Sequence, residues 1–221
     1  MYLVTGATGF VGSAVTRQLL ARGDAVRVLS RAESDQTNIR GLDVEVVEGD
    51  LLKPETLCDA VEGCDGVFHV AADYRLWTRN PEYMFRTNVD GSRAIVHAAL
   101  SAGVGRIVYT SSVAVLGYVS GGAADEETPV TYAEMIGPYK QSKFRADEAV
   151  RQLIEEKGAP VVIVNPSTPI GPRDVKPTPT GRVIVEAACG KMPAYVDTGL
   201  NVAHVDDVAA GHLLAFDKGS V

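Results

Sequence analysis

Residues 2–12 read Tyr2-Leu3-Val4-Thr5-Gly6-Ala7-Thr8-Gly9-Phe10-Val11-Gly12, and this stretch decides the fold. Apolar residues run directly into a turn whose glycines stand three residues apart. An amphipathic stretch follows, with its apolar side chains on one side. This order predicts a strand, a tight turn and the first residues of a helix.

The three glycines of this turn have separate roles. Gly6 lets the chain turn. Gly9 lets the backbone come close to a bound pyrophosphate, and Gly12 lets helix and strand pack together. Free N–H groups at the start of the helix then face the phosphates. The spacing G-x-x-G-x-x-G differs from the G-x-G-x-x-G of the commonest dehydrogenases. The residues that we expect to bind a dinucleotide here are Gly6, Thr8, Gly9, Phe10, Val11 and Gly12.

The composition narrows the class of protein. The chain has 221 residues, 46% of them apolar and 22% charged, as in a soluble globular protein. Its net charge of −7 argues against general nucleic-acid binding. No apolar run approaches the roughly 18 residues of a membrane span, and a strand directly after Met1 leaves no room for a signal peptide. Three cysteines without metal-ligand spacing predict reduced thiols in a cytoplasmic protein without a metal site.

Strand-like and helix-like stretches alternate along the first 165 residues. The expected strands after the first are 25–30, 44–48, 66–71, 106–111 and 160–164. The expected helices after the first are 54–61, 82–102 and 138–157. This alternation predicts an α/β fold with a doubly wound parallel sheet, the Rossmann fold, buried on both faces.

The texture changes after Asn165. Five prolines between Pro166 and Pro179 predict a stiffened loop. A helix near 181–188 and a strand near 201–205 follow, and Asp206 or Asp207 is expected to cap a last helix. We therefore divide the chain into a dinucleotide-binding domain, residues 1–165, and a partial substrate-binding lobe, residues 166–221, interleaved with the last sheet elements.

A tyrosine–lysine pair opens the long helix at 138–157. Tyr139 and Lys143 are four residues apart and share a helix face. A neighbouring ammonium lowers the pKa of a phenol, so the pair could pass a proton near neutral pH. The alternative is an ordinary solvated helix face. Ser111 and Ser112 end the preceding strand at the expected ligand-binding edge, where they could instead cap a turn.

In this order, the glycine turn, the strand-end serines and the tyrosine–lysine pair resemble the short-chain dehydrogenase/reductase superfamily. Its extended branch is indicated by the glycine spacing and by two later motifs, Asn165-Pro166-Ser167-Thr168 and His204-Val205-Asp206-Asp207-Val208. Ala71-Ala72-Asp73-Tyr74-Arg75-Leu76-Trp77 is similar to the hopanoid-associated sugar epimerases and their dihydroflavonol-reductase-like relatives. Extended members continue beyond the point that corresponds to Val221, so the substrate lobe is expected to be incomplete.

The resemblance implies a role for each matching residue. Tyr139 is the expected general acid/base, Lys143 holds the nicotinamide ribose and lowers the pKa of the tyrosine, and Ser112 binds the reacting oxygen. The other implied cofactor contacts are Asp50 and Leu51 at the adenine, Ala71 and Ala72 at the ribose and pyrophosphate, Asn88, Ser111, and Pro166 to Thr168 along the carboxamide. The expected substrate contacts, with lobe packing as the alternative, are Asp73, Tyr74 and Trp77.

The end of the second strand bears on the choice of cofactor. NAD binders place an acidic residue there to bind the ribose 2′-hydroxyl. This chain has Ser30 and Arg31 instead, with no acid before Glu33. A guanidinium matches a 2′-phosphate, so we expect NADP rather than NAD. The alternative is that Arg31 stacks on adenine or faces solvent.

The sequence favours an NADP(H)-dependent oxidoreductase or epimerase acting on a hydroxyl or carbonyl carbon of a small molecule, with a sugar or nucleotide sugar as the expected substrate. The alternatives are an NADPH-dependent ketone or dihydroflavonol-like reductase and a non-catalytic dinucleotide sensor. Arg173 and Lys176 are weaker candidates for a substrate phosphate. His204, Asp206, Asp207 and His212 could be read as metal ligands, but a capped helix explains them better. By analogy, helices 82–102 and 138–157 are expected to pair in a homodimer.

Overall fold

The computed structural model describes residues 1–221 and contains a six-stranded parallel sheet in the order β3-β2-β1-β4-β5-β6. The strands are β1 (Tyr2–Thr5), β2 (Val26–Ser30), β3 (Glu45–Glu48), β4 (Gly66–His69), β5 (Arg106–Thr110) and β6 (Val161–Val164). The order reverses between β1 and β4, which makes this point the switch where α/β sheets bind ligands. The predicted doubly wound fold is confirmed.

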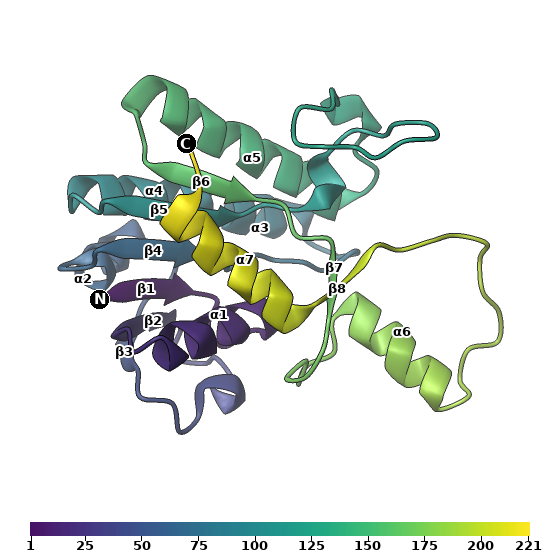
Figure 1. Ribbon diagram of the computed structural model, residues 1–221, viewed down its shortest axis with the longest axis horizontal. Helices are drawn as coiled ribbons and strands as arrows, with labels where there is room; N and C mark the ends of the chain where they lie inside the picture. The colour runs from purple at the N-terminus through teal and green to yellow at the C-terminus, as the bar shows by residue number, and fades with distance from the viewer.

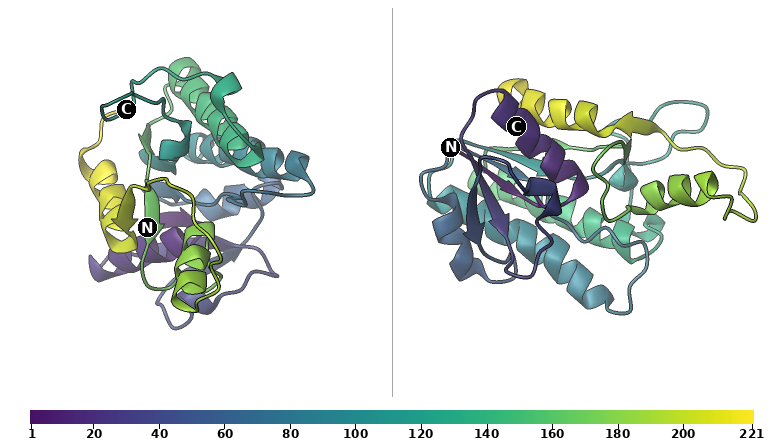
Figure 2. Two further views of the ribbon diagram at one scale, coloured as in Figure 1. Left: turned by 90° about the vertical axis from the view of Figure 1, so that its right-hand side faces the viewer. Right: turned by 90° about the horizontal axis from the view of Figure 1, so that it is seen from below.

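Helices cover both faces of the sheet (Figures 1 and 2). On one face, α1 (Phe10–Ala21) and α7 (Val205–Lys218) lie side by side. On the other lie α2 (Leu57–Val61), α4 (Gly91–Ser101) and α5 (Pro138–Lys157). Each face has its own apolar core, with Val4 and Phe68 on the first and Leu3 and Ile107 on the second, as the alternating side chains of a strand require.

The C-terminal helix is part of the helix layer on the first face. Gln18 of α1 donates a hydrogen bond to the Asp206 carbonyl at 2.5 Å, and Arg22 pairs with Asp217 at 3.0 Å. Phe216 stacks on Phe68 of β4 with ring centroids 5.3 Å apart. The sheet therefore buries segments from both ends of the chain.

The expected helix at 82–102 is present as one continuous helical run from Pro81 to Ser101, with a π-helical turn inside it. It consists of α3 (Pro81–Phe85), a π-helical turn (Arg86–Asp90) and α4. The π-turn inserts an extra residue, a device often found at functional sites, and it contains the buried Asn88. The remaining short turns are 3₁₀ helices, at Thr37–Ile39, Pro54–Thr56, Val113–Val115 and Tyr132–Glu134.

β3 differs from the expected fully buried strand. Three of its four residues are exposed, and its ends are Glu45 and Glu48. It is the edge strand of the sheet, where charged side chains discourage pairing with another chain. The alternation of strands and helices along the sequence does not distinguish an edge strand from a central strand of the sheet.

The region after β6 contains a second, two-stranded parallel sheet, β7 (Thr168–Ile170) with β8 (Val202–His204), and α6 (Pro179–Ala188). The prediction of an irregular loop from Pro166 was wrong for β7, because a proline is tolerated in an edge strand. The cap of α7 was also predicted wrongly. His204, the last residue of β8, accepts a hydrogen bond from the Asp206 N–H at 3.2 Å, since the strand runs directly into the helix.

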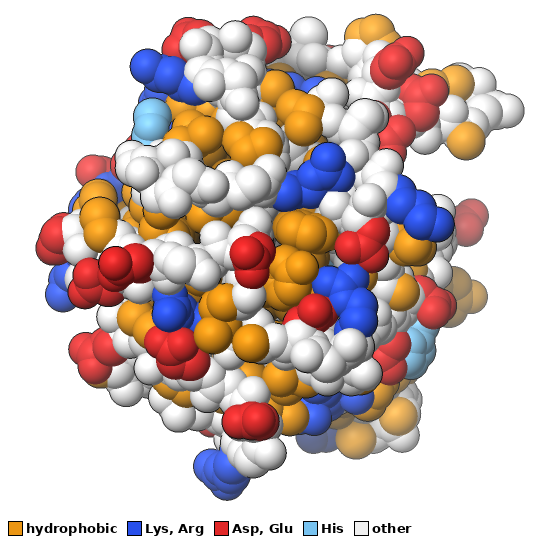
Figure 3. All heavy atoms as spheres, turned by 60° about the vertical axis from the view of Figure 1, so that its left-hand side comes forward, with side chains coloured by type: hydrophobic (Ala, Val, Ile, Leu, Met, Phe, Trp, Pro, Cys, Tyr) orange, Lys and Arg blue, Asp and Glu red, His pale blue; other side chains and the backbone are white.

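On the face of the molecule seen in Figure 3, acidic and basic side chains are interspersed, with apolar patches between them. None of the helices is both long enough and apolar enough to span a bilayer.

Candidate active site

The glycine turn lies at the switch point, between the ends of β1 and β4. Gly6 has φ +72°, and a Cβ there would lie 2.7 Å from the backbone nitrogen of Ala71. A Cβ at Gly12 would overlap the Gly6 carbonyl, so α1 packs on the turn only through glycine. Gly9 is the N-cap of α1, and no side chain caps this helix end. Its N–H groups are therefore available to an anion.

The rest of the turn and the residues after β4 lie beside the uncapped start of α1. Thr8 and Val11 are partly exposed, whereas Phe10 is buried in the core under α1. Ala71 and Ala72 follow β4 and are partly exposed. The uncapped backbone N–H groups at the start of α1 and the glycines of the turn suit the close approach of a pyrophosphate. The cofactor contacts predicted for these residues remain predictions.

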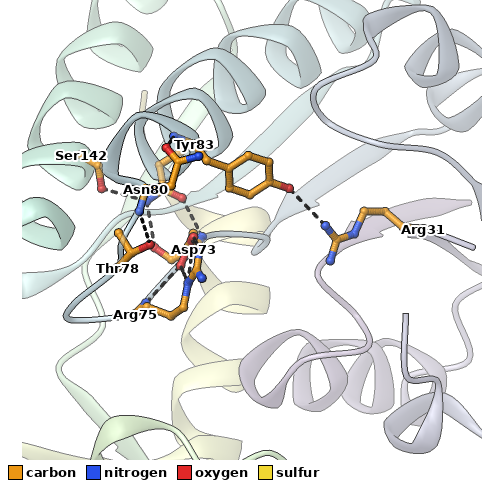
Figure 4. A network of polar contacts seen from close by, with 8 residues as sticks. Arg31, Asp73, Arg75, Thr78, Asn80, Tyr83 and Ser142 are labelled. Atoms are coloured by element: carbon orange, nitrogen blue, oxygen red, sulfur yellow. Dashed lines mark hydrogen bonds and ion pairs between the residues drawn. The ribbon is translucent and has the colours of Figure 1, made fainter. Parts of the chain in front are cut away.

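Arg31 follows β2 and extends across the carboxyl edge of the sheet toward α3 (Figure 4). Its guanidinium lies 3.4 Å from the Tyr83 hydroxyl and 3.6 Å from the Glu33 carboxylate. Its side chain is half exposed, so neither contact fixes it firmly. It is free to meet a ligand phosphate.

Asp50 and Leu51 follow β3. One oxygen of the Asp50 carboxylate accepts a hydrogen bond from the Leu52 N–H at 2.9 Å, which leaves the other oxygen for a ligand. Leu51 is buried against Gly91, where a Cβ would come within 3.0 Å of it. This contact positions the loop after β3 against the start of α4.

Ser112, Tyr139 and Lys143 come together at the carboxyl end of β5. Ser112 accepts a hydrogen bond from the Ala114 N–H at 3.1 Å, which fixes its hydroxyl at the start of a 3₁₀ turn. Burial raises the pKa of Tyr139, and a hydrogen bond with Ser112 acts in the opposite direction. Tyr139 is in the first turn of α5, behind a proline at the first helical position.

Lys143 is one turn further along α5 and only 3% exposed. Its ammonium donates to the Thr110 carbonyl at 2.8 Å and to the Tyr109 hydroxyl at 3.2 Å. Burial lowers the pKa of Lys143 to about 8, against an opposing effect of Asp147. The ammonium faces β5, and burial raises the pKa of Tyr139, so the predicted lowering of that pKa by Lys143 remains a prediction.

Ser111 and Ser112 have different surroundings although they are adjacent. The Ser111 side chain is buried and donates to the Asp147 carboxylate at 2.6 Å. The other oxygen of Asp147 pairs with Arg151 at 2.6 Å. Ser111 thus fastens β5 to α5, and only Ser112 faces Tyr139.

Asn88 ties the loop after β4 to α5. Its amide oxygen accepts from the Asp73 N–H at 2.7 Å, and its nitrogen donates to the Asp73 carbonyl and to Ser142 Oγ, both at 2.9 Å. Both donors of Asn88 are therefore used inside the protein. Its predicted contact with the cofactor remains a prediction.

The loop from Asp73 to Asn80 carries the expected substrate contacts. Asp73 pairs with Arg75, and Asn80 caps α3 by accepting from the Tyr83 N–H at 3.1 Å (Figure 4). Trp77 is 72% exposed and Tyr74 is 41% exposed. Both side chains are available to a ligand.

The segment after β6 is attached to the same edge of the sheet. The Val113 N–H donates to the Pro166 carbonyl at 3.2 Å, and Asn165 donates to the Ser112 carbonyl at 3.1 Å. Thr168 begins β7, and its N–H donates to the Asn201 carbonyl at 3.0 Å. The first two bonds hold Asn165 and Pro166 beside the strand end that carries Ser112, and the third joins Thr168 to the residue before β8.

The remaining candidates do not form a common site. His212 is buried and contacts Thr110 Oγ1 at 2.9 Å and the Val208 carbonyl at 2.7 Å. Arg173 pairs with Asp206, with its backbone in the left-handed region at φ +74°. The Thr110 contact of His212 joins β5 to α7, and the Arg173 pair joins the segment after β7 to α7. His, Cys, Asp and Glu form no group of three that could hold a metal ion.

Sequence reasoning missed Tyr109 and gave no role to His69. Tyr109 is 1% exposed and reaches Lys143, and its ring stacks on His69 with centroids 5.7 Å apart. The sequence feature that could have indicated them is a pair of aromatic rings with polar atoms, His69 and Tyr109, which are partners in the register of two neighbouring buried strands. Buried groups of this kind need partners.

A doubly wound sheet with an uncapped glycine turn at its switch point defines a dinucleotide-binding protein. The chain belongs to the NAD dependent epimerase/dehydratase family, whose profile matches residues 2–221. The resemblance to extended short-chain dehydrogenases inferred from the sequence is thereby confirmed.

Curated relatives cover nearly the whole chain. A Synechocystis protein named "Putative dihydroflavonol 4-reductase" is 49% identical over 99% of this chain and 63% of its own length. Sterol demethylase protein B of Methylococcus capsulatus is 38% identical over 98% of this chain and 66% of its own length. The chain thus spans about two thirds of the length of these relatives.

Solved structures share the fold closely. The crystal structure of gox2253 has a TM-score of 0.97 and 57% identity, covering 100% of this chain and 67% of that one. The dTDP-glucose 4,6-dehydratase DesIV of Streptomyces venezuelae, with NAD and TYD bound, has a TM-score of 0.88 and 28% identity, covering 100% of this chain and 73% of that one. These likenesses extend over both the sheet and the segment after β6.

Proposed function

We propose that this chain carries the catalytic apparatus of an NADP(H)-dependent oxidoreductase that interconverts a hydroxyl and a carbonyl on a small molecule. The observation that carries the proposal is the convergence of Ser112, Tyr139 and Lys143 at the end of β5. The glycine turn follows β1, two strands away in the same sheet. That separation is about 10 Å at ordinary strand spacing.

Each of the three side chains has one task in the proposed reaction. Ser112 donates a hydrogen bond to the reacting oxygen of the substrate. The Tyr139 phenol gives that oxygen a proton or takes one from it. The Lys143 ammonium binds the nicotinamide ribose. The nicotinamide, when bound, supplies or accepts the hydride.

Reduction of a carbonyl is the direction we favour. Burial raises the pKa of Tyr139, so its phenol is neutral at physiological pH and is ready to donate a proton. Relatives at 31–32% identity, such as cinnamoyl-CoA reductase 1 of Petunia hybrida and the 2-alkyl-3-oxoalkanoate reductase of Shewanella oneidensis, carry reductase names. The proposed substrate is therefore a small ketone or another activated carbonyl compound.

Epimerisation of a nucleotide sugar is the second candidate. It is favoured by the likeness to UDP-glucose 4-epimerase of Thermus thermophilus, at 26% identity and a TM-score of 0.83. An epimerase oxidises and re-reduces one carbon and leaves the cofactor unchanged overall. The two candidates therefore differ in net cofactor consumption.

Following NADPH absorbance with a panel of ketones, acyl thioesters and nucleotide sugars tests the proposal. We expect steady consumption with at least one ketone or thioester. Sugar interconversion without net consumption, seen by chromatography, would favour the epimerase. Dinucleotide binding without turnover on the whole panel would favour a sensor.

The cofactor preference depends on Arg31 in this proposal. We expect Arg31→Ala to weaken NADP binding by about 10- to 100-fold and to leave NAD binding nearly unchanged, because a guanidinium–phosphate pair is a strong charge-assisted contact. Isothermal titration measures both dissociation constants, with the exposed Arg40→Ala as the matched control. Tighter binding of NAD than of NADP by the unaltered chain would contradict the proposal.

The substrate-binding part of the chain is proposed to be residues 166–221 together with Asp73, Tyr74 and Trp77, which would contact the substrate.

A homodimer is also proposed. A groove between the helical run Pro81–Ser101 and α5 contains Phe85, Val89, Arg145 and Gln152 and is the proposed homodimer surface. Size-exclusion chromatography with light scattering measures the molar mass of the protein in solution. We expect a dimer for the unaltered chain and a monomer for Val89→Glu.

A further inference from the structure

Tyr109 is a buried tyrosine in the middle of the sheet, and its hydroxyl is directed at the proposed site. It belongs to β5 and directly precedes Thr110, whose carbonyl accepts a hydrogen bond from Lys143. The Lys143 ammonium lies 3.2 Å from the Tyr109 oxygen and 4.8 Å from the centroid of its ring. Lys143 is thus held by both the side chain of one residue and the backbone of the next.

A chain of hydrogen bonds leads from the end of β1 through His69, whose ring stacks on that of Tyr109, to Ser92 on α4. The Ala71 N–H donates to Thr5 Oγ1 at 3.2 Å, which lies 2.8 Å from His69 Nδ1. His69 Nε2 lies 3.0 Å from Ser92 Oγ, and Ser92 donates its own proton to the Asn88 carbonyl at 2.6 Å. Because that proton is used, Ser92 must accept from His69, which therefore carries its proton on Nε2 and accepts from Thr5 at Nδ1.

The contact between Lys143 and Tyr109 has a fixed direction. An ammonium group has three protons and no lone pair, so Lys143 donates and the Tyr109 phenol oxygen accepts. A phenylalanine at this position would fill the same space but would remove that acceptor.

The charged and titratable groups around Lys143 come from three elements. Asp147 and Tyr139 lie on the same helix, α5, and the Asp147 carboxylate raises the pKa of Lys143. Tyr109 on β5 is neutral, since burial raises its pKa far above the ordinary value. His69 on β4 is also neutral, since burial lowers its pKa to about 3, with a further lowering by Lys143.

We propose that Tyr109 is a positioning residue for Lys143: its hydroxyl accepts a hydrogen bond from the ammonium group and holds it at the carboxyl end of β5. The inference rests on the proposed function only in giving Lys143 a task at the nicotinamide ribose. Tyr109 itself touches neither Tyr139 nor Ser112 by any hydrogen bond of the structure and acts through the lysine alone.

The test compares Tyr109→Phe with Tyr2→Phe, which removes a phenol hydroxyl at the opposite end of the same sheet. Proteins labelled with ¹³C,¹⁵N-lysine are titrated by NMR, and the Lys143 signal is assigned by its loss in Lys143→Met. In the unaltered protein we expect Lys143 to titrate at about 8. Tyr109→Phe should lower this midpoint by about one pH unit, as expected for one lost hydrogen bond to a charge, and Tyr2→Phe should leave it in place.

Where the protein turns over a carbonyl substrate, the alkaline limb of the pH–kcat profile should move down by the same amount. An unchanged Lys143 titration in Tyr109→Phe overturns the proposal. If that variant does not fold, Tyr109→Met, which also lacks the hydroxyl, takes its place; a shift in the same direction is expected, and no shift overturns the proposal. Absence of turnover in the unaltered protein would contradict the proposed function, while the NMR result still decides the role of Tyr109.

Discussion

Two regions of the molecule differ in how far their side chains are buried. The helices on the six-stranded sheet are well packed, whereas the segment around α6 is exposed. α4 and α5 bury five and seven of their residues, whereas α6 buries none. Every residue from Arg182 to Val202 is exposed, including apolar ones such as Tyr195 and Val196. The two regions belong to one chain but have very different numbers of contacts to fix them.

The difference in packing divides the proposed catalytic residues from the segments that are expected to bind the substrate. The glycine turn, Ser112, Tyr139 and Lys143 are held by buried strands and by hydrogen bonds within the core. The segments expected to meet the substrate are loops and α6, which the core does not fix. A rigid scaffold with variable loops is a common way to keep one reaction while changing its substrate.

The largest expected effect is on kcat, and it is expected for a tyrosine of the well-packed region but not for a tyrosine of the exposed segment. Tyr139→Phe should reduce kcat by about 10²- to 10⁴-fold, because the proton donor is lost, with little change in NADPH affinity. Tyr195→Phe, at a side chain 90% exposed, should change neither. Steady-state kinetics and NADPH fluorescence titration measure the two quantities. Full turnover in Tyr139→Phe would remove the tyrosine from the mechanism.

Two glycines with positive φ sharpen the comparison further. Gly190→Ala, at φ +66° with open space around it, should cost only the strain of the left-handed backbone, about 1–2 kcal/mol. Gly6→Ala also forces a Cβ against Ala71, which should add about 1–3 kcal/mol and prevent dinucleotide binding. Urea denaturation and cofactor titration test this, and equal losses of stability would contradict the close approach at Gly6.

Two isoleucines on helices measure the packing difference directly. Ile95→Ala in α4 removes a side chain that is fully buried and should cost about 2–5 kcal/mol of unfolding free energy. Ile184→Ala in α6 makes the same chemical change at a side chain 48% exposed and should cost less than about 0.5 kcal/mol. Similar costs at both positions would mean that α6 is packed against a partner in solution.

The smallest effect is a pH dependence that belongs to the core alone. Burial lowers the pKa of His69 to about 3 from 6.5, so the unfolded chain binds more protons than the folded one between these values. Stability from this residue is complete above pH 6.5 and is lost as the pH falls toward 3. His69→Gln should flatten the slope of unfolding free energy in that window, while the exposed His97→Gln should not. An unchanged slope would mean that His69 is charged in the folded protein.

Much of the fold could be predicted because its signals are local. Apolar runs, the glycine turn and the proline and glycine at the two ends of α5 mark elements within a few residues of one another. The π-turn at Arg86–Asp90, the edge position of β3 and the strand β7 could not be predicted in this way. Each depends on a partner distant in the chain, such as Asp73 for Asn88 or Val202 for Thr168.

The sequence by itself determined the alternation of strands and helices, the glycine turn and the Tyr139–Lys143 spacing, since these depend on neighbours along the chain. Only the tertiary structure decided that Lys143 faces Tyr109 and Thr110 and that burial raises the pKa of Tyr139. The burial and the hydrogen-bond partners of these side chains depend on segments that meet only when the sheet forms. They cannot be derived from the spacing of residues along the chain.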